Sequence, residues 1–598
     1  MSIPIEDYAL LSNCRTAALV SREGSIDWLC VPRLDSGSLF GALLGDEEQG
    51  CWGLRPVDAK ATATREYDDD TFLLVTRWET SSGIAEVHDV MPIGEHGSVA
   101  EDRVDIVRRV VGIKGLVEFD HTVRMRFDYA RAMPWVRQVG TPESPELVAL
   151  AGPDAVILRG ARVTASDHVH AGKLAVAEGQ SVDLVLTWYP SHHEPPDRLA
   201  VDEVVARTRA WWQDWADRIT HEGPHRAEVV RSLLILRALT NHVTGGIAAA
   251  VTTSLPEDFG GVRNWDYRYV WLRDAALTLE ALLGHGFVKV AAQWREWLLR
   301  AVAGDPADLQ IMYGLAGERD LVERELDSFP GYAGSRPVRI GNGAALQYQA
   351  DVIGEVLVTL SAAREAGLTE SEFSWPLEKQ LVAQAARQLD KPDNGVWEIR
   401  CDPHMFTHSR VMVWATFDRA VRAVEAHGLE GPVDKWRELR DRVKAEIDEH
   451  GVTDGHFTQY YGTREVDASL LLLPQVGFCE PDDERMLATV AKIESDLLQD
   501  GLLRRYRNST GVDGLKGEEY PFLACSFWLV EQYAATARLD DARALMDRLC
   551  NLVNDVGMLS EEYDVAGKRQ AGNTPQAFSH LALVRAADAL ARARSQPR

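Results

Sequence analysis

Features that direct a protein to membranes or nucleic acids are missing from this sequence. Lys and Arg number 64 against 91 Asp and Glu, and the resulting net charge of −27 repels nucleic acids and anionic membranes. No apolar run approaches the roughly 20 residues that cross a bilayer. The first residues lack the basic and apolar regions of a secretory leader. We therefore expect a cytoplasmic protein with neither a nucleic-acid nor a membrane partner.

Paired cysteines and metal-ligand spacings are also scarce. The seven cysteines are odd in number and scattered, and no Cys-x-x-Cys pair occurs. This pattern predicts free thiols rather than a disulfide framework or a zinc site. His404 and His408 are four residues apart, but no third ligand pattern accompanies them. We expect neither a metal nor another cofactor.

The first 200 residues are patterned as β-structure. Segments 71–80, 104–111 and 181–188 are short and rich in β-branched or aromatic residues, and Gly, Pro, Asp and Ser separate them. Many short strands with turn signals are typical of a sandwich. We predict an N-terminal antiparallel β-sandwich over residues 1–200.

Helical periodicity begins near residue 200. Residues 202–219 carry an apolar stripe that includes Val204, Trp211 and Trp215, which predicts a linker helix within 201–223. Residues 224–598 follow as a helical C-terminal domain. Its predicted helices span 225–243, 272–285, 289–303, 344–366, 374–389, 409–427, 433–449, 483–498, 521–537, 539–553 and 575–593. About a dozen paired helices without a fixed repeat favour an (α/α)6 barrel over a solenoid.

Four loop regions concentrate aromatic residues, carboxylates and arginines. They are 262–279, 394–409, 517–528, and 557–564 followed by 572–580. Sugars are bound in this way, because aromatic faces stack on the ring and charged groups hydrogen-bond the hydroxyls. Glu398 lies beside Trp397 and apolar residues, a setting that favours the protonated form a general acid needs.

Each of these residues also has a purely structural interpretation. Asp274 could complement the start of a helix, and Glu398 could pair with Arg400. The adjacent Glu561 and Glu562 could be solvated surface charge. The residues alone leave these alternatives open.

Together, the motifs resemble glycoside hydrolase family 15, which contains glucoamylases, glucodextranases and related trehalases. Residues 5–33 look like the N-terminal domain of its trehalase-type bacterial members, and residues 263–274 continue the resemblance. The resemblance covers nearly the whole chain. It implies a β-sandwich, a helical linker and an (α/α)6 barrel, with an inverting mechanism that uses two glutamates.

The family motifs transfer onto individual positions. The Trp-Glu loop implies Glu398 as the catalytic acid, and the Leu-Ser-Glu segment implies Glu561, rather than Glu562, as the base. An Arg-Asp pair grips the terminal glucose in the family, and a tyrosine lies near the attacking water. The implied substrate-binding residues are Tyr267, Trp271, Arg273, Asp274, Tyr332, Arg336, Trp397, Glu518 and Glu519.

The resemblance implies an exo-acting hydrolase that releases β-glucose from the non-reducing end of a disaccharide or small oligosaccharide. Trehalose is the leading substrate. Glucoamylase-like and isomalto-oligosaccharide hydrolysis are the alternatives within the class. An inverting phosphorylase and a non-catalytic sugar-binding protein are alternatives of other classes. A homo-oligomer is left open.

Overall fold

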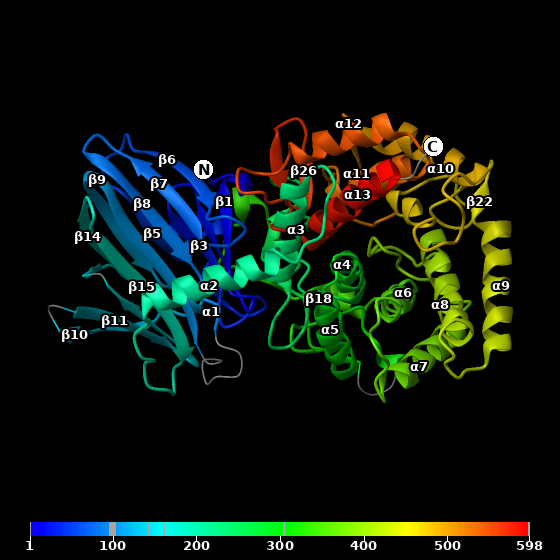
Figure 1. Ribbon diagram of the computed structural model, residues 1–598, viewed down its shortest axis with the longest axis horizontal. Coiled ribbons are helices and arrows are strands. Elements are labelled where there is room, and N and C mark those ends of the chain that lie inside the picture. The colour runs from blue at the N-terminus through cyan, green and yellow to red at the C-terminus, as the bar shows by residue number, and fades with distance from the viewer. Residues whose placement is uncertain (1, 95–102, 142–143, 161, 303–305, 596–598) are drawn as a thin grey trace.

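The computed structural model describes residues 2–94, 103–141, 144–160, 162–302 and 306–595. Figure 1 shows strands in the N-terminal part, helices in the C-terminal part, and helix α2 (Val201–Ala216) running between them. No helix among the described residues has both the length and the apolar character needed to span a bilayer.

The N-terminal strands form two antiparallel sheets that share strand β9 (Val104–Arg124). The other strands are β1 (Tyr8–Ser12), β2 (Ala17–Ser21), β3 (Ser25–Cys30), β4 (Ser38–Phe40), β5 (Cys51–Pro56), β6 (Thr62–Tyr67), β7 (Leu74–Glu79), β8 (Gly83–Val90), β10 (Trp135–Thr141), β11 (Ser144–Ala151), β12 (Asp154–Arg159), β13 (Thr164–Ser166), β14 (Val169–Ala177) and β15 (Ser181–Pro190). The first half of β9 pairs with β8 and β15, and the second half pairs with β5 and β14.

Two glycines let β9 pass from one sheet to the other. A Cβ on Gly112 would lie 2.1 Å from the carbonyl oxygen of Ala177. Gly115 adopts φ +68°, which a side chain would strain, and its Cβ would lie 2.3 Å from the Ser82 carbonyl oxygen. Glycine therefore permits the bend that folds the strands into a sandwich.

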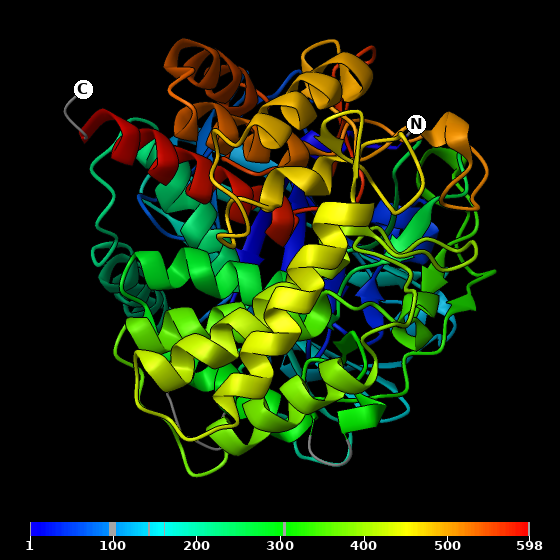
Figure 2. The same cartoon turned by 90° about the vertical axis from the view of Figure 1, so that its right-hand side faces the viewer.

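The C-terminal helices, which face the viewer in Figure 2, form an inner and an outer ring through their mutual contacts. The inner ring contains α4 (Leu272–Gly284), α6 (Val352–Glu365), α8 (Thr407–Glu425), the short 3-10 helix η8 (Ala468–Leu472), α11 (Leu523–Ala535) and α13 (Ala577–Ser595). The outer ring contains α3 (Arg226–Leu239), α5 (Val288–Ala301), α7 (Ser374–Arg387), α9 (Val433–His450), α10 (Glu484–Leu497) and α12 (Leu539–Cys550).

Burial patterns distinguish inner from outer helices, except for the outer helix α3, ten of whose 14 residues are buried. The inner helices α8 and α11 are buried around most of their circumference. The outer helix α10 buries one stripe, Met486, Val490, Ile493 and Leu497, at the spacing of one helical face. A helix that is apolar on one stripe covers the ring, whereas one that is apolar all round lies within it.

The sandwich and the barrel share one hydrophobic core and polar contacts. The Trp28 indole donates a hydrogen bond to the carbonyl of Val251 at 3.0 Å. The fully buried Arg268 pairs with Asp266 at 2.7 Å and donates at 2.8 Å to the carbonyl of Ser36 in the sandwich. The N-terminal domain thus holds, from behind, the segment that continues into α4.

The predicted fold class is confirmed, with one clear local difference. Residues 344–366 were expected to be helical throughout, but α6 begins only at Val352. Asn342 accepts a hydrogen bond from the Ala344 amide and starts the 3-10 turn Gly343–Leu346. The chain between that turn and α6 brings Gln347 and Gln349 towards the carboxylate described below. We propose the three-part division at 1–200, 201–223 and 224–598 for the chain.

Candidate active site

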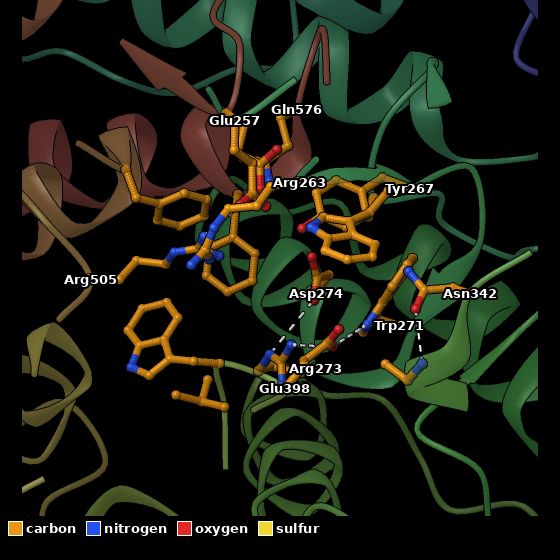
Figure 3. A pocket seen from close by; sticks show the side chains of 18 of the residues that line it. Glu257, Arg263, Tyr267, Trp271, Arg273, Asp274, Asn342, Glu398, Arg505 and Gln576 are labelled. Atoms are coloured by element: carbon orange, nitrogen blue, oxygen red, sulfur yellow. Dashed lines mark hydrogen bonds and ion pairs between the residues drawn. The ribbon is translucent and has the colours of Figure 1, made fainter. Parts of the chain in front are cut away.

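A pocket lies where the N-terminal ends of α4, α11 and α13 meet the loop before α8 (Figure 3). Its lining comes from segments 263–274, 342–344, 396–400, 505–506 and 576–578, with Ala249, Glu257, Leu515, Phe522 and Glu561. Its empty volume, with the solvent at its open mouth included, is about 780 Å³. Helix N-termini carry partial positive charge, which favours carboxylates at this end of the barrel.

Glu398 reaches the pocket from a strained loop position. Its backbone has φ +57°, a left-handed conformation that costs a non-glycine residue about 1–3 kcal/mol. The Glu398 amide donates to the carbonyl of Gly395 at 3.1 Å. Gln347 donates to the carbonyls of Glu398 and Ile399, both at 3.1 Å. These bonds hold the turn that directs the side chain into the pocket.

The Glu398 carboxylate is held on one side only. The indole N–H of Trp271 donates to Oε1 at 2.6 Å, and Arg273 Nη2 lies 3.4 Å from the same oxygen (Figure 3). Gln349 and Asp351 fix the other end of the Arg273 guanidinium, at 3.0 and 3.3 Å. Because the donors that the described residues supply converge on Oε1, Oε2 faces the pocket as the oxygen available to a ligand.

Arg273 and Asp274 form a buried donor–acceptor pair in the first turn of α4. Asp274 Oδ2 lies 3.7 Å from Arg273 Nε, and neither atom has a hydrogen-bond partner among the described residues. Burial raises the pKa of Asp274 to about 7, with Arg273 opposing the rise and Glu398 adding to it. Both residues line the pocket, although these two atoms themselves are almost inaccessible to solvent.

Glu561 occupies a second, separate network in the same pocket. Its Oε2 accepts from the amide of Asn573 at 3.4 Å, and the Tyr267 hydroxyl also bonds to the carboxylate. Its Oε1 is buried without a hydrogen-bond partner among the described residues. Gly572 has φ +74°, and a Cβ there would lie 2.6 Å from the Cβ of Glu561. Only glycine therefore lets the two strands of this turn close around Glu561.

Three buried carboxylates, Glu257, Glu561 and Glu562, have oxygens within 4.8 Å of one another. Burial first, and the charge of Glu257 second, raise the pKa of Glu561 well above its usual range. Burial, together with Glu561, also raises the pKa of Tyr267 well above its usual range, so the phenol stays protonated and donates. The carboxylates could hold a cation, but Arg505 already lies 3.1 Å from Glu257 and 3.5 Å from Glu562.

Arg505 and Arg263 are pocket residues that sequence reasoning missed. Arg505 donates to Glu519 at 3.0 and 2.6 Å. Arg263 donates to Glu519 at 3.1 Å and to Asp513 at 2.6 Å. Their partners are distant in the sequence, so no local spacing reveals them. The arginine content of region 262–279 was a signal for Arg263, whereas Arg505 lies outside the four loop regions.

Seven of the sequence-predicted residues line this one pocket: Tyr267, Trp271, Arg273, Asp274, Trp397, Glu398 and Glu561. The Trp397 ring packs within 6.3 Å of Tyr506 and Phe522, between ring centroids, and adds an aromatic wall. Glu398 is bonded to Trp271 and Arg273 rather than to Arg400, and Glu561 and Glu562 are buried. The structure therefore contradicts the pairing of Glu398 with Arg400 and the interpretation of Glu561 and Glu562 as solvated surface charge.

Four predicted residues are not among the described residues that line the pocket. Tyr332 is buried against the N-terminal domain, where its hydroxyl donates to the carbonyl of Ile3 at 2.9 Å. Arg336 is exposed and donates to the carbonyl of Pro330 at 2.9 Å. Glu518 is exposed and pairs with Arg504, whereas Glu519 is buried and holds Arg263 and Arg505 from outside the cavity. The loop around Tyr332 therefore serves the domain contact.

An aromatic-walled pocket in an (α/α)6 barrel, with two carboxyl groups held in separate networks, is the site of a glycoside hydrolase. A family model for glycosyl hydrolases family 15 matches residues 223–588. A second model, for a trehalase-like N-terminal domain, matches residues 1–208. The chain belongs to glycosyl hydrolases family 15, and its enzymatic class is that of a glycoside hydrolase.

Similar proteins cover almost the entire chain. It is 37% identical over 611 aligned residues to the trehalase of Mycobacterium tuberculosis, covering 98% of this chain and 89% of that protein. It is 35% identical over 581 residues to the trehalase of Thermoplasma acidophilum, covering 96% of this chain and 98% of that one. A crystal structure of a bacterial glucoamylase complexed with acarbose has the same fold, with a TM-score of 0.75 at 12% identity over 99% of this chain and 94% of that one.

Proposed function

We propose that this enzyme hydrolyses trehalose with inversion, using Glu398 as general acid and Glu561 as general base. The observation that carries the proposal is that both carboxyl groups line one pocket while different residues hold them, Trp271 and Arg273 in one case and Tyr267 in the other. The near full-length similarity to proteins named trehalases supports trehalose as the substrate.

Substrate binding is assigned to the pair at the start of α4. Both residues line the pocket, where the Arg273 guanidinium offers donors and the Asp274 carboxylate an acceptor. Two adjacent hydroxyls of a terminal glucose supply the complementary acceptor and donor. The aromatic rings of Trp271 and Trp397 then contact the faces of the sugar.

Bond cleavage requires one proton to be donated to the glycosidic oxygen and one proton to be removed from the attacking water. Protonated Glu398 gives its proton to the glycosidic oxygen as the bond to the anomeric carbon breaks, and the resulting carboxylate accepts the Trp271 N–H. Ionised Glu561 removes a proton from a water that attacks that carbon from the opposite face. One trehalose and one water give one β-glucose and one α-glucose, and the two glutamates end with exchanged protonation.

The position of Glu561 supports water as the nucleophile. A water molecule needs a general base to become nucleophilic, whereas phosphate is already an anion, and the pocket contains the Glu561 carboxyl group as such a base. The Tyr267 hydroxyl donates to Glu561, which orients the carboxylate that activates the water. This arrangement favours hydrolysis over the phosphorylase alternative.

The test compares Glu398→Gln, Glu561→Gln and the control Glu518→Gln. Glu518 is exposed and paired with Arg504, so the same chemical change there leaves the pocket intact. General acid and base groups contribute about 10²–10⁴-fold each, so kcat on trehalose should fall by that factor in the first two variants only. Near-normal turnover by either pocket variant contradicts the assignment.

Proton NMR of the first glucose released tests substrate and stereochemistry together. Trehalose, maltose, isomaltose and a longer maltooligosaccharide are compared with the purified enzyme. Equal initial amounts of α- and β-glucose from trehalose, with trehalose cleaved best, support the proposal. Faster cleavage of maltose or isomaltose to β-glucose keeps the mechanism and changes the substrate. Release of α-glucose alone from trehalose refutes inversion.

A cytoplasmic location is part of the same proposal. All seven cysteines are unpaired thiols, and Cys14, Cys30, Cys51, Cys525 and Cys550 are buried. Proteins of oxidising compartments commonly use such residues in disulfides. Fractionation of the native cells with an antibody against the enzyme tests this location, which recovery from the extracellular fraction would contradict.

A further inference from the structure

Three side chains meet at the end of the barrel remote from the pocket. His221 lies between α2 and α3, His285 follows the last residue of α4, and Asp588 lies on α13. Both α4 and α13 begin at the pocket, and the 13 residues of α4 span about 20 Å. The cluster is therefore separate from the catalytic residues and links three distant segments of the chain.

The three groups converge on one small volume. His221 Nδ1 lies 2.8 Å from Asp588 Oδ1, and His285 Nε2 lies 3.3 Å from Asp588 Oδ2. One potential ligand atom from each residue lies within 4.8 Å of the other two. The side chains of His221, His285 and Asp588 are 2%, 3% and 20% exposed. Asp588 thus leaves one side of the cluster open to solvent.

The His221 ring is already oriented as a metal ligand. Its Nε2 lies 3.1 Å from the carbonyl oxygen of Pro224, to which it donates. That bond keeps one ring proton on Nε2, so the Nδ1 proton, which is donated to Asp588 Oδ1 at 2.8 Å, is the one that a metal ion would displace. Metal-bound histidines commonly use their second nitrogen in this way. A Cβ on Gly223 would lie 2.6 Å from Nε2, so glycine is needed beside the ring.

His285 is poorly satisfied by the described residues, although its Nε2 lies 3.3 Å from Asp588 Oδ2. Neither ring nitrogen makes a hydrogen bond of acceptable geometry with the described residues, although the side chain is almost fully buried. A buried polar group without a partner is costly, and such groups in native proteins call for an explanation. An ion between His285 Nε2 and Asp588 provides one.

We propose that His221, His285 and Asp588 bind a divalent transition-metal ion, with zinc the best match. Two imidazoles and one carboxylate are ligands that zinc accepts, and the solvent-facing side leaves a coordination position for water. The ion would fasten the segment after α2 to the ends of α4 and α13. This role stabilises the junction between sandwich and barrel and takes no part in sugar hydrolysis.

The sequence motifs gave no sign of this site, and we expected no metal from them. The three ligands lie far apart in the chain, outside any spaced motif. The alternative occupant is a proton shared along the His–Asp–His cluster. That alternative predicts no specific uptake of metal.

The test uses the full chain, stripped with a chelator and dialysed, and titrated with zinc chloride by calorimetry. His285→Asn removes one ligand, and His225→Asn is the matched control, because His225 pairs with Asp547 outside the cluster. We expect one zinc per chain, a zinc-dependent rise in Tm, and at least tenfold weaker binding in H285N but not in H225N. Absence of zinc binding by the wild-type chain, or equal binding by H285N, overturns the proposal.

A second measurement uses only the wild-type chain, so its result does not depend on whether a variant folds. X-ray absorption at the zinc edge, on the wild-type chain loaded with one equivalent, reports the ligands directly. Two imidazole nitrogens at about 2.0–2.1 Å are expected. A shell of oxygen ligands alone would place the ion elsewhere, such as among Glu257, Glu561 and Glu562, and would refute the assignment.

Discussion

The hydrogen bond from Trp271 to Glu398 offers the sharpest test of the proposal that Glu398 is the catalytic acid. Trp271→Phe keeps an aromatic ring against the sugar but deletes the N–H that reaches Glu398 Oε1 at 2.6 Å. Glu398 gains negative charge only as it gives up its proton. The lost bond therefore matters more in the transition state than in the substrate complex.

The magnitude follows from the type of bond. Hydrogen bonds to charged groups contribute about 1.5–3 kcal/mol. At 1.36 kcal/mol for each factor of ten, that range corresponds to roughly a 10- to 150-fold fall in kcat. Arg273, 3.4 Å from the same oxygen, remains in the variant and prevents a complete loss. KM should change little, because the ring that contacts the sugar is retained.

The assay is steady-state glucose release from trehalose by wild type, W271F and the control Trp265→Phe. Trp265 lines the same pocket, but its ring lies against the guanidinium groups of Arg339 and Arg400, 4.6 and 4.1 Å from the ring centroid. We expect W265F to leave kcat close to wild type. A W271F variant with unchanged kcat and a raised KM would refute the argument, since Trp271 would then only bind sugar.

Three further perturbations test other parts of the structure. Glu257→Gln removes the charge that, after burial, raises the pKa of Glu561 most. The proposed base must be ionised, so activity falls as the pH drops through the pKa of Glu561. The variant should therefore shift the acid limb of the kcat/KM profile to lower pH. Gly572→Ala should lower kcat roughly 100-fold by displacing Glu561, while a crystal structure with Glu561 unmoved would contradict this reasoning. Arg268→Met leaves the buried Asp266 carboxylate unpaired, and should lower the free energy of unfolding in urea by about 3–5 kcal/mol; an unchanged denaturation midpoint would contradict it.

Helix positions could be predicted well because apolar periodicity is a local property. The expected helix 433–449 corresponds to α9, Val433–His450, and the expected 483–498 to α10, Glu484–Leu497. Prediction failed before α6, where the apolar run 344–366 continues through a turn. Capping by Asn342 and the bonds of Gln347 to the acid loop determine that conformation, and neither appears in a hydrophobic pattern.

Residues of the candidate site could be predicted only where they belong to a continuous sequence motif. The stretch 263–274 and the two glutamate segments were recognisable because their residues are adjacent in sequence. Glu518 and Glu519 are also adjacent, yet one faces solvent and the other is buried beneath Arg505. Burial of that kind depends on contacts between distant segments, and so does the position of Tyr332 against Ile3. Such contacts are decided by tertiary packing.

The arrangement of the pocket has a consequence for biosynthesis. Domains generally fold as units, from the N-terminus onward, while the chain is made. The sandwich, which presents the Ser36 carbonyl to Arg268, is complete before the first pocket segment leaves the ribosome. Glu561 and the start of α13 arrive almost last. A nascent or prematurely terminated chain therefore carries the proposed acid without the proposed base, and we expect activity only when translation is nearly finished.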